Sequence, residues 1–266
     1  MKDWSLHMRT SSWLRWAFFF ILFGFGMKFL NGEGPFSLNQ FDEVTLNQLV
    51  GCVFLVFSIV IWLKRPYITQ SVAILSFACL FADSWSSFQT SGYVPEQLIE
   101  HATKLLLPVL IFLLNQPFWT RERTQISLKI IVALTFIGHG LFAVGWHYVP
   151  GSFHTMTTSI LGISGNQAST FLCTVGTLDF IAAACLFLPN PFYKPALIYL
   201  VLWGSLTTLA RTAFPISTLD FDIQSIYTGI AGTIYRFPHA MLPMLLFAYT
   251  YRNVSSPAAK QIVTQS

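Results

Sequence analysis

Two histidines lie in the segment FIGHGLFAVGWH, residues 136–147, which otherwise consists almost entirely of apolar residues and glycine. An imidazole exchanges a proton near neutral pH and can ligate a metal, so each histidine is a candidate for chemistry. Other ionisable side chains interrupt apolar segments in the same way: Asp83, Glu100, His101, Lys104, Asp179, Arg211, Arg236 and His239. What these groups can do depends on whether the segments lie in water or in lipid.

The composition indicates that the surrounding medium is a lipid bilayer. Apolar residues make up 54% of the 266-residue chain and charged residues 10%, whereas an ordinary soluble domain has about 25% charged residues. No basic run with interleaved aromatic residues occurs, which argues against a nucleic-acid partner. The four cysteines form no C-x-x-C pair, so neither a structural zinc site nor a thiol-exchange centre is predicted.

The sequence predicts an all-α, polytopic membrane protein with about eight transmembrane helices, because a spanning helix needs about 20 mostly apolar residues. The windows that meet this requirement are 12–31, 47–65, 70–89, 97–116, 127–149, 168–188, 194–214 and 234–252. Pro66, Pro117 and Pro189 follow the second, fourth and sixth windows, where proline is expected to end a helix.

Basic residues fall on one side of the predicted membrane. The positive-inside rule assigns to the cytoplasm the ends that carry Lys2, Arg9, Arg15, Lys64, Arg65, Arg121, Arg123, Lys129, Lys194, Arg252 and Lys260. The opposite loops carry acidic residues and no basic one. We therefore expect both termini to be cytoplasmic, in an inner or plasma membrane. No small-residue cleavage site follows the first span, which is interpreted as a retained helix.

The sequence contains an internal similarity. FGFGMKF (23–29) aligns with IGHGLFA (137–143) through its two glycines, and Phe25 then stands opposite His139. KLLLPVLIFLL (104–114) aligns with HAMLPMLLFAY (239–249) through a shared proline. The glycines have an alternative role, because they let helix backbones approach closely in lipid.

This similarity predicts two domains, residues 1–117 and 118–266, each a four-helix membrane repeat. Since each repeat contains an even number of spans, the two repeats are expected to be parallel, related by an axis along the membrane normal.

The opening span, LRWAFFFILFGFGMKF, begins with a basic residue and closes with the stretch from Gly24 to Lys28. In the sixth span, VGTLDFIAAACLFLP, acidic Asp179 precedes small residues. In both features the chain resembles the DoxX-like membrane proteins. The resemblance implies four-helix bundles and membrane-bound redox chemistry, linked in some relatives to quinone-dependent sulfur oxidation. The chain departs from the pattern with Val56 or Phe57 at the acidic position of the first half and Phe142 opposite Lys28.

The polar residues within the predicted spans fall mostly in the outer half of the bilayer. Because a charge inside a membrane is costly unless it is paired or hydrated, this distribution predicts an outward-facing polar cavity between the halves. Its candidate residues are Asp83, Glu100, His101, Lys104, His139, Asp179, Arg211, Arg236 and His239.

Local pairing is an alternative role for several of these residues. Lys28 and Arg236 can snorkel to the membrane interface. The pairs that their positions allow are Glu100 with Lys104 at i,i+4 spacing, Asp83 with Arg211, and His139 with Asp179.

Three classes of function are compatible with such a cavity. The first is redox-linked and uses quinone, haem or a lipid-soluble substrate, alone or with a redox partner subunit; His139 with His101 or His239 is the candidate haem ligand pair. The second is a transporter or channel for a small polar or anionic solute. The third is a non-catalytic membrane subunit. No H-E-x-x-H, G-x-S-x-G, P-loop or dinucleotide-binding motif occurs, so catalytic residues and enzyme activity stay open.

Overall fold

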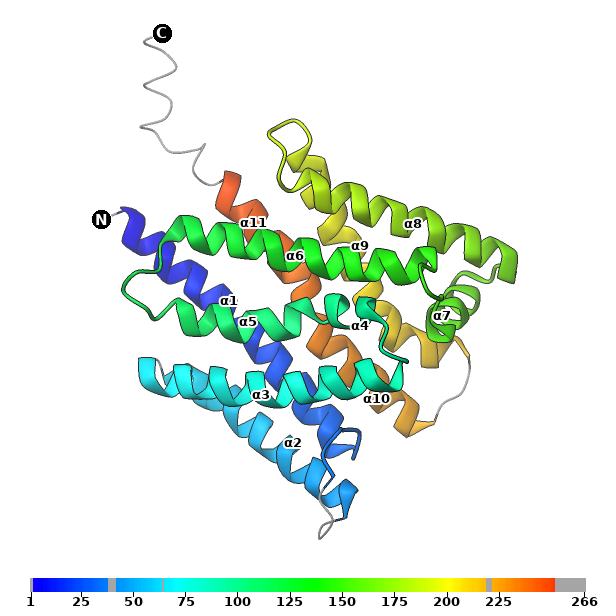
Figure 1. Ribbon diagram of the computed structural model, residues 1–266, viewed down its shortest axis with the longest axis horizontal. Coiled ribbons are helices and arrows are strands. Elements are labelled where there is room, and N and C mark those ends of the chain that lie inside the picture. The colour runs from blue at the N-terminus through cyan, green and yellow to red at the C-terminus, as the bar shows by residue number, and fades with distance from the viewer. Residues whose placement is uncertain (1, 38–41, 64, 219–221, 252–266) are drawn as a thin grey trace.

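The computed structural model describes residues 2–37, 42–63, 65–218 and 222–251, and within these ranges it contains helices and no strand. The helices are α1 (Lys2–Leu30), α2 (Glu43–Val60), the short 3₁₀ helix η1 (Ile61–Leu63), α3 (Pro66–Thr90), α4 (Pro95–Glu100), α5 (Ala102–Leu113), α6 (Arg121–Val144), α7 (Gly151–Leu161), α8 (Gly165–Cys185), α9 (Tyr193–Ser217), α10 (Ile223–Arg236) and α11 (Pro238–Tyr251) (Figure 1). The all-α prediction is confirmed.

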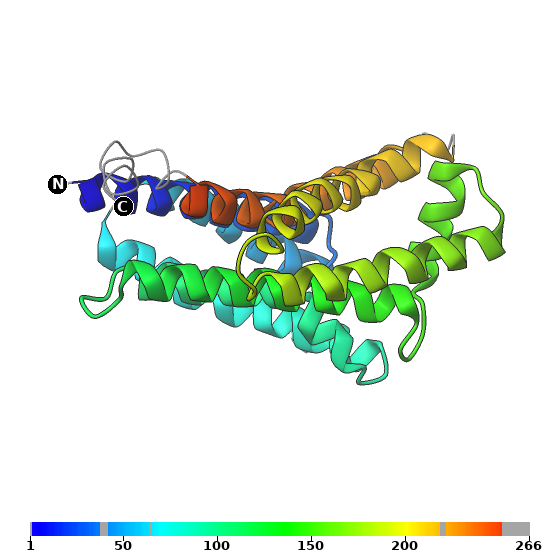
Figure 2. The ribbon, with the colours of Figure 1, turned by 90° about the horizontal axis from the view of Figure 1, so that it is seen from above.

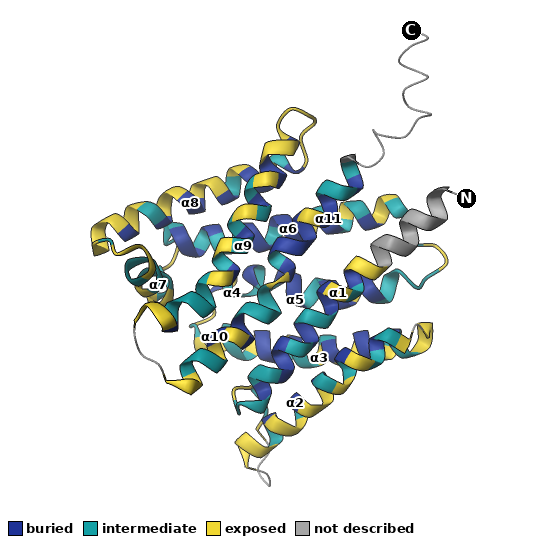
Figure 3. Ribbon diagram, turned by 180° about the vertical axis from the view of Figure 1, so that it is seen from behind, coloured by how far each residue is buried: buried dark blue, intermediate teal, exposed yellow. Residues whose placement is uncertain are grey.

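Among the described residues, six helical segments are long and apolar enough to cross a bilayer: Ser12–Leu30, Glu43–Leu63, Pro66–Thr90, Arg121–Val144, Gly165–Cys185 and Tyr193–Ser217. They correspond to the first, second, third, fifth, sixth and seventh predicted windows. The outer helices expose large apolar side chains, among them Val56, Ile59, Ile74, Ile181, Leu202 and Leu206, whereas many buried side chains come from the central helices α6 and α11 and from Ser12–Leu30 of α1 (Figure 3). Such a surface fits contact with lipid, as in a multi-pass membrane protein.

The fourth and eighth predicted windows are not single helices, and in this respect the predicted spans are wrong. In the fourth, α4 ends at Glu100 and α5 begins at Ala102, because the intervening His101 has φ −77° and ψ 4°, outside the helical region. In the eighth, α10 ends at Arg236 and α11 begins at Pro238, which has no N–H to continue the helical hydrogen bonds. Both windows are therefore discontinuous.

Each discontinuity is held by a glycine of a helix from the other half of the chain. α1 packs against α10, and α6 packs against α4. A Cβ added at Gly24 in α1 would lie 2.5 Å from the backbone N of Tyr235, and one added at Gly138 in α6 would lie 2.3 Å from the backbone N of Glu100. No other residue permits so close an approach of helix backbones.

Two helix pairs within the halves also meet through glycines. α1 packs against α2 and α6 against α8. A Cβ at Gly51 in α2 would lie 2.9 Å from the carbonyl O of Gly26, and a Cβ at Gly176 in α8 would lie 2.9 Å from the carbonyl O of Gly140. In each G-x-G motif, therefore, one glycine contacts the interrupted helix of the other half, and the other glycine contacts a neighbouring helix of its own half.

Seen from above, α1 and α11 lie in one layer and α5 and α6 in another, and the layers diverge toward α7 (Figure 2). α7 contacts α8 and α9. It follows Pro150 and ends at Leu161, and the next residue, Gly162, has a φ of 64° that suits glycine. The segment between the fifth and sixth predicted spans therefore contains a helix, placed where the two layers separate.

The loop before α10 also ends in a defined cap. The side chain of Asp222 accepts a hydrogen bond from the backbone N–H of Ser225 at 3.0 Å, which starts α10. Backbone N–H groups of Ser225 and Gln224 hold the pKa of Asp222 below its ordinary value. Of the residues used to predict orientation, Lys64, Arg252 and Lys260 lie outside the described residues, so the cytoplasmic placement of the termini stays a prediction.

The first testable prediction concerns the glycine contacts. Gly138→Ala is expected to destabilise the fold by about 1–3 kcal/mol, because overpacking forces α6 away from α4. Its added Cβ meets backbone atoms, which cannot rotate aside. The measurement is the thermal denaturation midpoint in detergent, followed by size-exclusion chromatography. Gly151→Ala is the matched control, since a Cβ there meets nothing within 4 Å. Equal midpoints for the two variants would contradict the proposed close approach.

Candidate functional site

A buried ion cluster joins α1, α3 and α5. The carboxylate of Asp83 accepts hydrogen bonds from Lys28 Nζ at 2.7 Å and from Lys104 Nζ at 2.7 Å. Asp83 is 3% exposed and Lys104 is 7% exposed. Both ammonium groups also lie over the ring of Phe25, at 5.4 and 5.1 Å from its centroid. Each charged group in this cluster has an oppositely charged partner at hydrogen-bond distance, which indicates a structural role.

This cluster corrects two pairings and one interfacial placement expected from sequence. Asp83 does not pair with Arg211, because both of its oxygens are bonded to lysines. Lys104 donates to Asp83 in place of its i,i+4 neighbour Glu100. Lys28 does not snorkel free to the interface, since it donates to the same carboxylate. Packing across helices therefore outweighs the local spacing that suggested these pairs.

A second, less complete cluster forms where the two discontinuous helices meet α6. Oε1 of Glu100, the last residue of α4, lies 3.6 Å from Nδ1 of His139 and 3.9 Å from Nη2 of Arg236. Both separations exceed a normal hydrogen-bond length. The rings of His139 and His239 meet edge to face, with centroids 5.3 Å apart. The two helix breaks thus place a carboxylate and a guanidinium side by side.

Tyr235 connects the two clusters and was missed by the sequence analysis. Its hydroxyl accepts a hydrogen bond from Nη1 of Arg236, and the Arg236 guanidinium lies 4.5 Å from its ring centroid. On its other side the ring packs against Phe25, with centroids 4.6 Å apart. A tyrosine in an apolar helix carries no sequence pattern that distinguishes this role from ordinary packing. Arg236 is consequently held within the protein and does not snorkel.

The second cluster opens into a cavity of about 360 Å³ that is lined mainly by α6, α7, α8 and α9, with Arg236 of α10 and His239 of α11, a size typical of small-molecule sites. Its ionisable lining residues are Asp179, Arg211, Arg236 and the two contacting histidines, and its walls are otherwise mainly apolar, with Phe136, Phe153, Ile160, Phe171 and Leu206 among them. α7 covers part of it through Phe153 and Ile160. Five of the nine predicted cavity residues, His139, Asp179, Arg211, Arg236 and His239, therefore share one cavity.

Several hydrogen-bond donors of this cavity have no acceptor within the described part of the chain. The Arg211 guanidinium forms no hydrogen bond or ion pair there, and lies 5.8 Å from the ring centroid of Phe153. Nε2 of His139 and Nε of Arg236 are buried without a partner. Leaving a buried polar group unpaired costs about 1–3 kcal/mol. The arrangement therefore favours a ligand that supplies acceptor oxygens at this end of the cavity.

Asp179 lies in α8, in the same cavity, but has a different partner from the one expected. Its carboxyl accepts a hydrogen bond from the Tyr199 hydroxyl at 2.9 Å, and His139 has the Glu100 carboxylate as its acidic neighbour. The predicted His139–Asp179 pair is therefore wrong. Tyr199 on α9 gave no signal in the sequence, because its distance from Asp179 along the chain corresponds to no local motif.

The haem prediction was tested against the same geometry. His139 and His239 are in direct ring contact, which leaves no space for a porphyrin between them. Nε2 of His101 lies 3.0 Å from the side-chain nitrogen of Gln97, and His101 does not line the cavity. In the described residues no group of three or more His, Cys, Asp or Glu could hold a metal ion. The residues present do not fit a haem with two histidine ligands.

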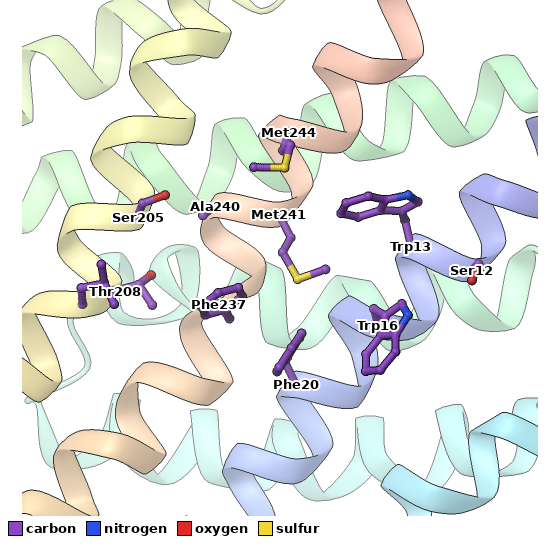
Figure 4. Close-up of a pocket in the computed structure, with 11 residues that line it drawn as sticks. Ser12, Trp13, Trp16, Phe20, Ser205, Thr208, Phe237, Ala240, Met241 and Met244 are labelled. Atoms are coloured by element: carbon purple, nitrogen blue, oxygen red, sulfur yellow. The ribbon is translucent and has the colours of Figure 1, made fainter. Parts of the chain in front are cut away.

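A larger groove of about 880 Å³ lies on the surface between α1, α9 and α11 (Figure 4). Trp13, Trp16 and Phe20 line one side, and Phe237 and Met244 line the α11 side. Among the residues that the structure describes, no ionisable side chain lines it. A groove of this composition suits lipid chains and offers no chemistry, so the smaller cavity is the candidate site.

No protein-family model, curated protein or solved structure matches the chain.

A second prediction concerns the compensated cluster. Asp83→Asn is expected to destabilise the protein by about 3–5 kcal/mol, because it leaves buried Lys104 without its counter-charge. Denaturation midpoints in detergent measure the loss, with Glu43→Gln, a neutralised carboxylate on an exposed helix start, as control. The double variant Asp83→Leu with Lys104→Met is expected to be more stable than Asp83→Leu alone. If the double variant is less stable than the single one, the cluster does not act through charge compensation.

Proposed function

We propose that this multi-pass membrane protein binds a lipid-soluble, amphipathic anion in the cavity lined by α6, α7, α8 and α9. The observation that carries the proposal is Arg211, a guanidinium that lines an otherwise mainly apolar cavity and has no acceptor within the described chain. Nε of Arg236 adds an unpaired donor in the same cavity. A carboxylate or phosphate head group satisfies these donors, because guanidinium groups bind such oxygens strongly.

The apolar part of the cavity suits the tail of such a molecule. Leu206 and Leu209 line the cavity and are also 59% and 53% exposed on the lipid-facing surface of α9. Leu161, at the end of α7, is 49% exposed and lines it as well. These residues give a path from the bilayer into the cavity that an acyl or prenyl chain can follow without leaving an apolar environment.

Transport of the same anion is the second candidate function, and the helix breaks favour it. Discontinuous helices at corresponding positions of two halves commonly form the binding site of transporters. Aligning 104–114 with 239–249 places the end of α4 and the end of α10 within one residue of each other. Both ends contribute to the cluster, through Glu100 and Arg236.

We infer that the chain consists of two four-helix repeats, residues 1–117 and 118–266. Support comes from the glycine contacts, which recur in both halves. Gly24 and Gly138 are equivalent in the repeat alignment, and so are Tyr235 and Glu100, the residues whose backbones they touch. In this alignment α1 corresponds to α6 and α10 corresponds to α4, so the contact of α1 with α10 is equivalent to the contact of α6 with α4.

The resemblance to DoxX-like proteins, the redox role and the cytoplasmic termini also stay proposals. A quinone can accept hydrogen bonds from the same donors through its carbonyl oxygens, with or without a redox partner subunit. The nature of the ligand in the cavity therefore decides between the anion-binding and redox-linked functions.

The third prediction tests the bound ligand directly. Protein purified in a mild detergent is extracted with solvent, and the extract is analysed by mass spectrometry and optical spectroscopy. We expect an anionic lipid in near-stoichiometric amount from the unsubstituted protein, and tritiated palmitate is expected to bind saturably in phosphatidylcholine nanodiscs. Arg211→Gln is expected to weaken palmitate binding by roughly tenfold or more, the scale of one lost charged contact.

Arg123→Gln is the matched control, because Arg123 is exposed and donates to the backbone of Phe118 away from the cavity. Equal palmitate affinity in the Arg211 and Arg123 variants would remove Arg211 from the site. Stoichiometric quinone in the extract, without an anionic lipid, would overturn the anion proposal and favour the redox-linked function.

A further inference from the structure

We infer that Glu100 sets the charge of the ligand, so that the site selects monoanions over dianions. This inference rests on the proposed function, since it concerns the head group bound between Arg211 and Arg236. Glu100 belongs to the first half of the chain, whereas the residues that line the cavity belong to the second half. The inference therefore gives a residue of the first half a role in the specificity of this cavity.

The environment of Glu100 differs from that of a structural carboxylate. Glu100 is 8% exposed, yet its side chain forms no hydrogen bond in the described part of the chain, and its nearest cationic groups lie 3.6 and 3.9 Å away. Asp83, buried to a similar degree, has two hydrogen bonds of 2.7 Å. Glu100 therefore contributes negative charge to the cluster without fully occupying the donors of Arg236.

The charges that face Glu100 come from every helix packed around it. On its own helix, Glu96 is paired with His147 at 2.5 Å. From α5, Lys104 is bound to Asp83. The groups left where the ligand's head group is proposed to bind are Arg211, Arg236 and the contacting rings of His139 and His239. Arg236 also donates to the neutral hydroxyl of Tyr235. Asp179, also in the cavity, bonds to Tyr199 and forms no ion pair with either guanidinium among the described residues.

Glu100 does not line the cavity itself, but it places a negative charge 3.6 Å from His139 and 3.9 Å from Arg236, which do. A bound monoanion meets this charge with one negative charge of its own. A dianion brings a second negative charge toward Glu100 in a buried, largely apolar space, which is costly. The ligand class that fits is therefore a long-chain carboxylate or a phosphodiester lipid. A phosphate monoester, whose second pKa is about 6, is mostly dianionic at neutral pH.

The experiment compares two probes that differ in one methyl group. Hexadecyl methyl phosphate is a monoanion at pH 7.5, whereas hexadecyl phosphate is mostly a dianion. Binding of each tritiated probe is measured in phosphatidylcholine nanodiscs. We expect the unsubstituted protein to prefer the diester by roughly tenfold, and Glu100→Gln to abolish or reverse this preference by strengthening monoester binding, as a change in charge complementarity does. Glu96→Gln, which neutralises a carboxylate paired outside the cavity, is expected to keep it.

The outcomes separate the two proposals. If neither probe nor palmitate binds saturably to the unsubstituted protein, both the proposed function and this inference are overturned. If the probes bind with Arg211-dependent affinity but Glu100→Gln leaves their ratio unchanged, the charge inference alone is overturned. A monomeric size-exclusion profile and retained palmitate binding establish that the Glu100→Gln protein is folded, and Glu100→Asp, which keeps the charge, is expected to retain the preference for the diester.

Discussion

The structure depends on two close backbone contacts, where glycines of α1 and α6 meet the interrupted helices of the opposite half. Gly24 touches the backbone of Tyr235 and Gly138 that of Glu100. These contacts bring the ends of α4 and α10 into the centre of the bundle, where their side chains cannot reach bulk water. A helix end in this position must present polar groups to its neighbours. The positions of Glu100 and Arg236, and hence of the cavity's head-group end, follow from this constraint.

Burial of charge then divides the polar residues into two kinds. Around Asp83 each charge has a partner at hydrogen-bond distance, and the lysines also rest on Phe25. Around Glu100 the separations are longer, and Nε of Arg236 and Nε2 of His139 remain unpaired within the described chain. A protein that needed only stability would gain from completing this second cluster or from replacing it by apolar residues. Its incomplete pairing is the physical reason to assign it to ligand binding.

The sequence was sufficient for the properties that depend on periodicity and composition. It predicted an all-α membrane protein, and it selected the buried polar residues, because a charge in a long apolar run stands out wherever it lies. It did not predict their partners: Asp83 is separated from Lys28 by 55 positions, and the rotation of each helix decides which side chains meet. The break at His101 and the helix α7 were also missed. Neither follows from local propensity, since neighbouring helices determine both.

The repeat alignment accounts for the placement of the cavity in one half. Phe25 stands opposite His139, and Lys104 opposite His239, so the same backbone positions carry different chemistry. In the first half, buried Phe25 supports two lysines that both donate to Asp83, and the fully buried ring of Phe54 adds to a solid core. In the second half, two histidines occupy the corresponding places beside Arg211, which has no such carboxylate partner. In the proposed repeat, the first half supplies a stable bundle while the second half accommodates a cavity lined by Arg211, which has no acceptor among the described residues. The first half still takes part, because Glu100 lies 3.6 Å from His139 and 3.9 Å from Arg236, which line the cavity.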